Sequence, residues 1–223
     1  MNTWMSVKAI VAKDIQSELR TRYALNALLM FVLTTVSIIL FALRGDQPSS
    51  TVLAGMFWVV VFFSAMSGLS RAFVSEEERG TAMTLQLVAL PSSVYFGKLI
   101  FNVLLTLSLV LGVTIVYTVA FPGFTIRSLD IFLTTVALGS LGLASAATII
   151  AAIIAKANTR GTLYPVLSFP ILIILLMSVM NATAKALDGV PFEEAAVDFV
   201  VLISYVMVIT AGSYLLFDYV WKD

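Results

Sequence analysis

The sequence predicts an all-α integral membrane protein with six transmembrane helices. Of its 223 residues, 60% are hydrophobic and only 12% are charged, whereas soluble globular domains are about 45–50% apolar and about 25% charged. The apolar residues also gather in runs that reach the roughly 20 residues a spanning helix needs. We therefore expect the excess apolar surface to face lipid and residues 1–223 to form one transmembrane domain.

Residues 1–22 precede the first apolar run and predict an amphipathic helix that lies in the membrane interface. Within residues 4–22, apolar side chains recur at three- and four-residue spacing, namely Trp4, Val7, Val11, Ile15 and Leu19. Polar side chains take the opposite face: Lys13, Gln16, Ser17 and Arg20. A disordered basic tail is the alternative interpretation, and the periodicity favours the interfacial helix.

Six apolar runs predict the spans: residues 23–43, 52–74, 99–121, 131–155, 163–180 and 199–217. They divide the chain into 23–74 with spans 1 and 2, 97–180 with spans 3–5, and 199–218 with span 6. An even number of crossings places both termini on the same side of the membrane.

The distribution of Lys and Arg predicts which side that is. The terminal side collects ten basic residues: Lys8, Lys13, Arg20, Arg22, Arg71, Arg79, Lys98, Lys156, Arg160 and Lys222. The other side has three: Arg44, Arg127 and Lys185. Because positive charge accumulates in cytoplasmic loops, we expect both termini to be cytoplasmic.

Residues 181–198 form the longest loop on the external side. An Ala-rich first half is followed by a break at residues 188–191, which indicates two short helical pieces. We expect a small external cap or helical hairpin there rather than a soluble domain.

Residues 75–91 form a charged segment on the cytoplasmic side. Ser75 and Glu78 have capping-box spacing, Gly80 interrupts, and Thr81 is placed to cap a second short helix that ends at Pro91. The apolar residues of that helix exceed what a solvated loop needs and suit a partner's groove. The candidate docking residues are Glu76, Glu77, Glu78, Arg79, Gly80, Thr81, Met83, Leu85 and Leu87. An ordinary capped connection with solvated charges explains the same pattern equally well.

Several kinds of chemistry are excluded by what the chain lacks. It has no cysteine and no histidine, which removes thiolate and imidazole metal sites and Ser–His or Cys nucleophiles. Gly97-Lys98 is not a phosphate-binding loop, because Ser92 replaces the first glycine and Leu99 replaces Ser/Thr. No ionisable residue lies near the middle of a predicted span, which disfavours ion-coupled transport. We expect a non-catalytic chain with no metal and no directly bound cofactor, and a net charge of zero indicates no nucleic-acid partner.

The order of Glu-Arg-Gly-Thr, a short apolar helix, a proline and a lysine resembles the ABC-2 type (type V exporter-like) permeases. A closer resemblance is to the heme exporter protein B (CcmB) family of cytochrome c maturation. It rests on four stretches: Gly55-Met56-Phe57-Trp58, Arg71-Ala72-Phe73, Leu87-Val88-Ala89-Leu90-Pro91, and Leu163-Tyr164-Pro165-Val166-Leu167 with Pro170. The strongest part covers residues 55–102. The three consecutive glutamates before Arg79 are more acidic residues than the family's pattern requires.

The resemblance implies a permease subunit of the bacterial inner membrane in which residues 75–91 are the coupling helix. Its implied partners are a CcmA-like ATPase, a CcmC-like heme-handling protein, a small CcmD-like helper and a second copy of the chain. ATP hydrolysis by the partner would then drive release of the heme-loaded periplasmic chaperone. The complex would handle heme through ligands on a partner, because Met177, Met180 and Tyr117 are better explained by packing or lipid contact. Alternative functions are a generic ABC-2 permease for a lipid, drug or polysaccharide, a passive scaffold, and an intramembrane enzyme.

Overall fold

The computed structural model describes the backbone of residues 3–155 and 160–222, and their side chains except at 21, 23–25, 27, 160–167 and 222. Every described element is helical, as predicted, and none is a strand. Lys156 and the side chains of Arg160, Lys222 and residues 163–167 lie outside the described part. The elements are α1 (Thr3–Thr21), α2 (Tyr23–Leu43), α3 (Ser50–Leu69), α4 (Arg71–Glu78), α5 (Ala82–Val88), α6 (Pro91–Ala120), α7 (Leu129–Ala155), α8 (Arg160–Asp188), the 3-10 helix η1 (Phe192–Ala195) and α9 (Ala196–Lys222).

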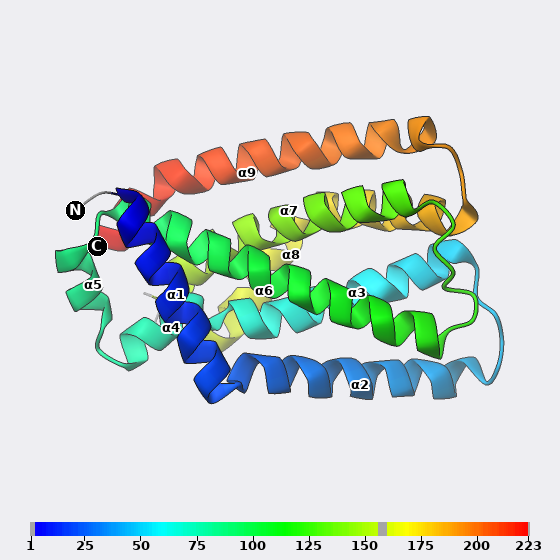
Figure 1. Cartoon of the computed structure of the whole chain (residues 1–223), viewed down its shortest axis with the longest axis horizontal. Helices are drawn as coiled ribbons and strands as arrows, with labels where there is room; N and C mark the ends of the chain where they lie inside the picture. The colour runs from blue at the N-terminus through cyan, green and yellow to red at the C-terminus, as the bar shows by residue number, and fades with distance from the viewer. Residues whose placement is uncertain (1–2, 156–159, 223) are drawn as a thin grey trace.

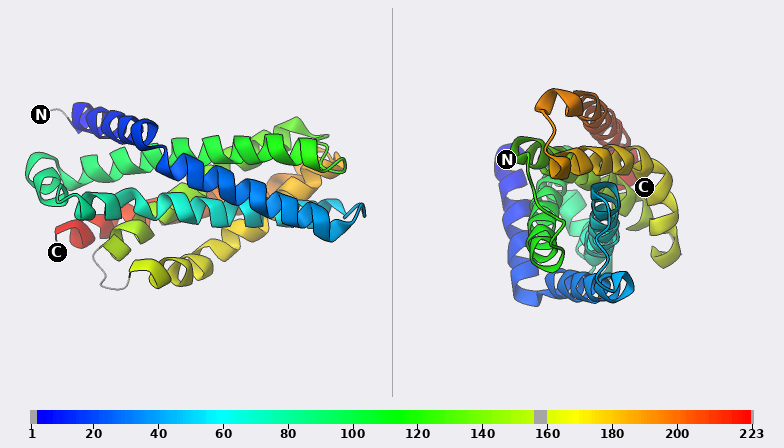
Figure 2. Two further views of the ribbon diagram at one scale, coloured as in Figure 1. Left: turned by 90° about the horizontal axis from the view of Figure 1, so that it is seen from below. Right: turned by 90° about the vertical axis from the view of Figure 1, so that its right-hand side faces the viewer.

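The long helices lie side by side along the length of the molecule, and α1 crosses them obliquely near one end (Figures 1 and 2). Both chain termini and α5 lie at that same end (Figure 1), which we call the terminal end. This arrangement agrees with the predicted placement of both termini on one side of the membrane, which stays a prediction together with the sixth crossing. The cytoplasmic identity of that side stays a prediction.

Five helices of the described part are long and apolar enough to cross a membrane: Ser50–Glu78, Pro91–Ala120, Leu129–Ala155, Ser168–Asp188 and Phe192–Trp221. The apolar stretch Leu28–Leu43 within α2 is shorter, so a sixth crossing at α2 stays a prediction. The chain is a multi-pass membrane protein.

Helix α1 forms as predicted but buries a mixed face. Val7, Ile10 and Asp14 are buried, whereas Trp4 and Leu19 of the predicted apolar face are exposed. The buried face packs on α6, where Gly97 permits close approach because a β-carbon there would lie 2.7 Å from Cγ2 of Ile10. The exposed apolar residues remain available for lipid.

Three predicted boundaries are wrong. Ser75 is no helix cap, because α3 and α4 follow each other almost without interruption and the three glutamates end α4 instead of starting a helix. Pro91 is the first residue of α6 and needs no side-chain cap, since proline suits the first helical turn. The external cap is not two separate pieces, because its first half continues α8 through Asp188 and only η1 is distinct.

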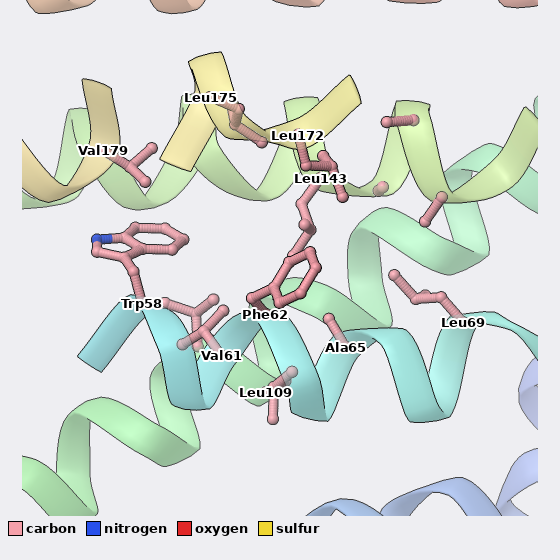
Figure 3. Close-up of a cluster of buried hydrophobic side chains, with 14 of the residues drawn as sticks. Trp58, Val61, Phe62, Ala65, Leu69, Leu109, Leu143, Leu172, Leu175 and Val179 are labelled. Atoms are coloured by element: carbon pink, nitrogen blue, oxygen red, sulfur yellow. The ribbon is translucent and has the colours of Figure 1, made fainter. Parts of the chain in front are cut away.

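The centre of the molecule is an apolar contact between α3, α7 and α8 (Figure 3). The α3 residues Trp58, Phe62 and Ala65 face α7 and α8 side chains that include Leu143 and Leu175 (Figure 3). The indole nitrogen of Trp58 donates a buried 2.8 Å hydrogen bond to Thr183. Small residues let these helices approach, as is typical of membrane interfaces.

Candidate functional site: a buried charge network beneath α5

A cluster of charged side chains lies inside the terminal end, where α1, α4 and α6 meet. Its centre is Lys98 of α6, which is only 2% exposed and lies 2.9 Å from an oxygen of Asp14 and 2.8 Å from Oε1 of Glu76. The Lys98 ammonium also lies 5.8 Å from the ring centre of Phe73, within range of a cation–π contact. One ammonium thus joins a carboxylate from α1 to a carboxylate from α4.

Glu76 has further partners at both of its oxygens. The hydroxyl of Thr81 donates to Oε2 at 2.6 Å, and the Lys13 ammonium donates to Oε1. Burial by itself would lower the pKa of Lys13, but its hydrogen bond to Glu76 and the charges of Asp14 and Glu76 outweigh burial and raise the pKa. Lys13 therefore stays positively charged at physiological pH.

This network links helices that are far apart in sequence. Taking charges out of water is costly unless they are paired and hydrogen-bonded, so each of Asp14, Glu76 and Lys98 depends on the others. Thr81 immediately precedes α5, and its contact with Glu76 extends the network to the start of that helix. A continuous set of contacts therefore joins the start of α5 to α1 and α6.

The predicted docking residues divide into two groups in the structure. Glu76 is buried and bonded within the chain, while Glu78 is exposed and pairs with Arg71 at 3.0 Å. Glu77 is half-buried, and the exposed Arg79 donates to Ser17 at 3.1 Å. Glu78 and Arg79 are therefore exposed on the surface, whereas Glu76 contacts only residues of its own chain among those described.

Gly80 and Thr81 make the turn between α4 and α5. Gly80 has a φ of +68°, and a β-carbon at this position would meet no other atom within 4 Å. Glycine is therefore favoured here because it adopts a positive φ readily, and not because space is lacking. Thr81 occupies the position before α5, as predicted, but its hydroxyl does not cap that helix and bonds to Glu76 instead. The position was predicted correctly and its mechanism was not.

Helix α5 projects at the terminal end with an uncovered apolar face. Met83, Leu87 and Val88 are 73%, 82% and 65% exposed. Leu85 is half-buried and packs on the core, and the amide of Gln86 donates to the backbone oxygen of Trp221 in α9 at 2.5 Å. The helix is fixed on its inner side and apolar on its outer side.

Sequence reasoning missed the importance of Asp14 and Lys98. Asp14 was not singled out as a site residue, and Lys98 was used only in the count of basic residues, in the phosphate-loop argument and as the lysine of the permease pattern. The available signal was the position of Asp14 one turn after Ile10 and Val11, where an acid interrupts an otherwise apolar helix face. Its partner on α6, more than 80 positions away, had no local signal.

The opposite end has a separate ion pair and an aromatic cluster. Lys185 of α8 lies 2.8 Å from Asp198 of α9 and also donates to the backbone oxygen of Glu194. Tyr117 is fully buried and makes edge-to-face contacts with Phe57 and Phe124. Of the methionines considered as heme ligands, Met177 is exposed on α8, and Met180 contacts α3 at Gly55. These positions agree with packing roles.

Comparison with known families identifies the chain. The sequence profile described as CcmB protein matches residues 5–217, which is nearly the whole length. A comparison with individually curated proteins gave no significant match. The family match favours a role in cytochrome c maturation over a generic ABC-2 permease, and CcmB proteins are non-catalytic permeases that work with an ATPase and other Ccm proteins. The chain therefore belongs to the CcmB family, the heme exporter permeases of cytochrome c biogenesis.

Proposed function

We propose that this chain is the permease subunit on which a separate CcmA-like ATPase docks through α5. The observation that carries the proposal is the exposed apolar face of Met83, Leu87 and Val88 at the terminal end. Exposed apolar residues in a cluster are typical of a protein–protein contact. The neighbouring charged residues Glu78 and Arg79 would form the polar rim of that contact.

The buried network supplies the path by which docking affects the rest of the chain. A displacement of α5 would be transmitted to Glu76 through its hydrogen bond with Thr81. Glu76 and Asp14 both pair with Lys98. The displacement would therefore pass to α1 and α6 together. Helix α3 leads directly into α4, which gives a second route toward the opposite end.

The remaining parts of the proposal follow the family. The terminal end faces the cytoplasm of the bacterial inner membrane, in agreement with the excess of Lys and Arg there. A CcmC-like protein, a CcmD-like helper and a second copy of the chain complete the complex, which handles heme as its cargo. The opposite end, with residues 181–198, would assist release of the heme-loaded periplasmic chaperone when ATP is hydrolysed.

The substitution Leu87→Asp tests the docking role. Leu87 is 82% exposed, so the fold tolerates the change, while loss of an interface anchor costs about 2 kcal/mol, or roughly 30-fold in affinity. We expect reduced co-purification of the ATPase subunit and reduced ATPase turnover in the assembled complex. Leu87→Met, which keeps an apolar side chain, is the matched control and retains both.

A second control places the same charge at the opposite end. Leu129 begins α7 and is also exposed, and Leu129→Asp leaves ATPase association unchanged. If Leu87→Asp and Leu129→Asp bind the ATPase equally well, α5 is not the docking helix.

A further inference from the structure

Three neighbouring hollows run from the terminal end along the outside of the bundle. The first is a polar cleft of about 300 Å³ between α1, α4 and α6. The second is an apolar groove of about 270 Å³ between α2 and α6. A small apolar space shares Gly68 and Leu105 with the cleft and shares Leu28, Leu105 and Leu109 with the groove. Leu105 lines all three, so the cleft and the groove adjoin each other along α6, and the small space between them is too narrow to admit a water molecule.

The two ends of this surface differ sharply in chemistry. The groove is lined almost entirely by apolar residues, Leu28, Leu29, Val32, Leu33, Leu105, Leu109, Val113 and Val116, with Ser108 and Gly112. The cleft is lined by three basic residues, Arg71, Arg79 and Lys98, and three acidic residues, Asp14, Glu18 and Glu78. A charged cleft next to an apolar groove suits an amphiphile whose polar head lies in the cleft and whose apolar tail lies in the groove.

The charge balance indicates which kind of head the cleft accepts. Three cations against three carboxylates leave the lining neutral, which suits a zwitterion better than an anion. The side chains of Arg71 and Glu78 are both about half exposed, and exposed ion pairs of this kind contribute little to stability. Arg71 can therefore turn to a phosphate while Glu78 accepts from an ammonium, and the exchange costs little.

We propose that this surface binds one phospholipid with a phosphoethanolamine head, which lies in the polar cleft while an acyl chain lies in the α2–α6 groove. The primary ammonium offers three N–H donors to the carboxylates of the cleft, as a lysine ammonium would. The phosphate pairs with Arg71 and Arg79. A choline head has no N–H donor, and a glycerol head carries net negative charge, so both bind more weakly.

Lipid exchange followed by native mass spectrometry tests the proposal. The purified full-length chain is incubated with vesicles of equal parts phosphatidylethanolamine, phosphatidylcholine and phosphatidylglycerol, and the retained lipids are counted. We expect one phosphatidylethanolamine per chain, preferred at least about tenfold over each of the others, which is the factor that one hydrogen bond to a charged group provides.

Two glycines supply a matched pair of variants. A β-carbon at Gly112, in the groove, meets no atom within 4 Å, and the same holds for Gly212 on α9, which lines none of these hollows. Gly112→Trp fills the groove, and we expect it to lose the retained lipid. Gly212→Trp adds the same side chain elsewhere and keeps it. Because Gly112→Trp is a large change, both variants are first compared by helicity and gel filtration.

A variant of the head cleft keeps the test decisive if Gly112→Trp misfolds. Arg71→Gln removes an exposed cation and is expected to reduce phosphatidylethanolamine retention about tenfold, whereas Arg127→Gln at the opposite end does not. Retention of the three lipids in equal amounts overturns the proposal, as does a Gly112→Trp chain that keeps its lipid. Stoichiometric displacement of the lipid by heme would assign the surface to heme and overturn it as well.

Discussion

Replacing Lys98 with methionine tests whether the buried network holds the terminal end together. Lys98→Met keeps the length and most of the apolar volume of the side chain but removes its charge. The side chains of Asp14 and Glu76 are only 9% and 8% exposed, so both lose their buried partner without gaining access to water and keep only the half-exposed Lys13 as a cation. Removing one member of a buried ion pair typically costs about 3–5 kcal/mol.

The loss is measured by thermal unfolding of the purified chain in one detergent. For a chain of this length, 1 kcal/mol corresponds to about 2–4 °C, so we expect the Tm to fall by about 6–20 °C. Lys185→Met is the matched control, because it removes a 2.8 Å ion pair whose ammonium is 34% exposed. Its expected cost is smaller, about 1–2 kcal/mol.

A rescue separates lost charge pairing from lost packing. Adding Asp14→Asn and Glu76→Gln to Lys98→Met removes the uncompensated charges while preserving shape, and should recover most of the Tm. A Lys98→Met chain that is as stable as Lys185→Met, or a triple variant that is no more stable than Lys98→Met alone, refutes this account of the network.

Three further substitutions test the packing of the bundle. Gly139→Ala should destabilise the protein by about 1–3 kcal/mol, because its β-carbon would lie 2.7 Å from the Trp58 indole. Gly112→Ala has open space around the new β-carbon and should be neutral or stabilising by up to about 1 kcal/mol. Equal Tm values for the two variants would contradict the close contact of α7 with Trp58. Tyr117→Phe should leave the stability of the protein unchanged or raise it by about 1 kcal/mol, since the buried Tyr117 hydroxyl has no hydrogen-bond partner in the described part of the chain. A clear loss of Tm would show that this hydroxyl has a partner.

The helical membrane architecture was predictable because lipid imposes strong constraints on sequence. Long apolar runs identified most of the spans, and their even number predicted the common end of both termini. Helix boundaries were less predictable: Ser75 to Glu78 fits a capping box, yet the chain from α3 remains helical through these residues. The preceding apolar helix overrides the local capping signal.

The candidate site was predictable only in its exposed part. The apolar residues of α5 and the turn at Gly80 follow from local pattern, and both appear in the structure. The role of Glu76 does not follow, because three adjacent glutamates look equivalent in sequence and only the helix phase turns one of them inward. Lys98 and Asp14 are joined by tertiary packing at Gly97, which no local pattern records.

Site-specific cross-linking gives the most direct test of α5 as the ATPase contact. The chain has no native cysteine, so a single cysteine introduced at position 87 or at position 129 is a unique attachment point. In the assembled complex, we predict that Leu87→Cys cross-links to the ATPase subunit in high yield and that Leu129→Cys does not. Equal yields at the two positions, or no cross-link from position 87, would contradict the central claim that α5 is the site of ATPase docking.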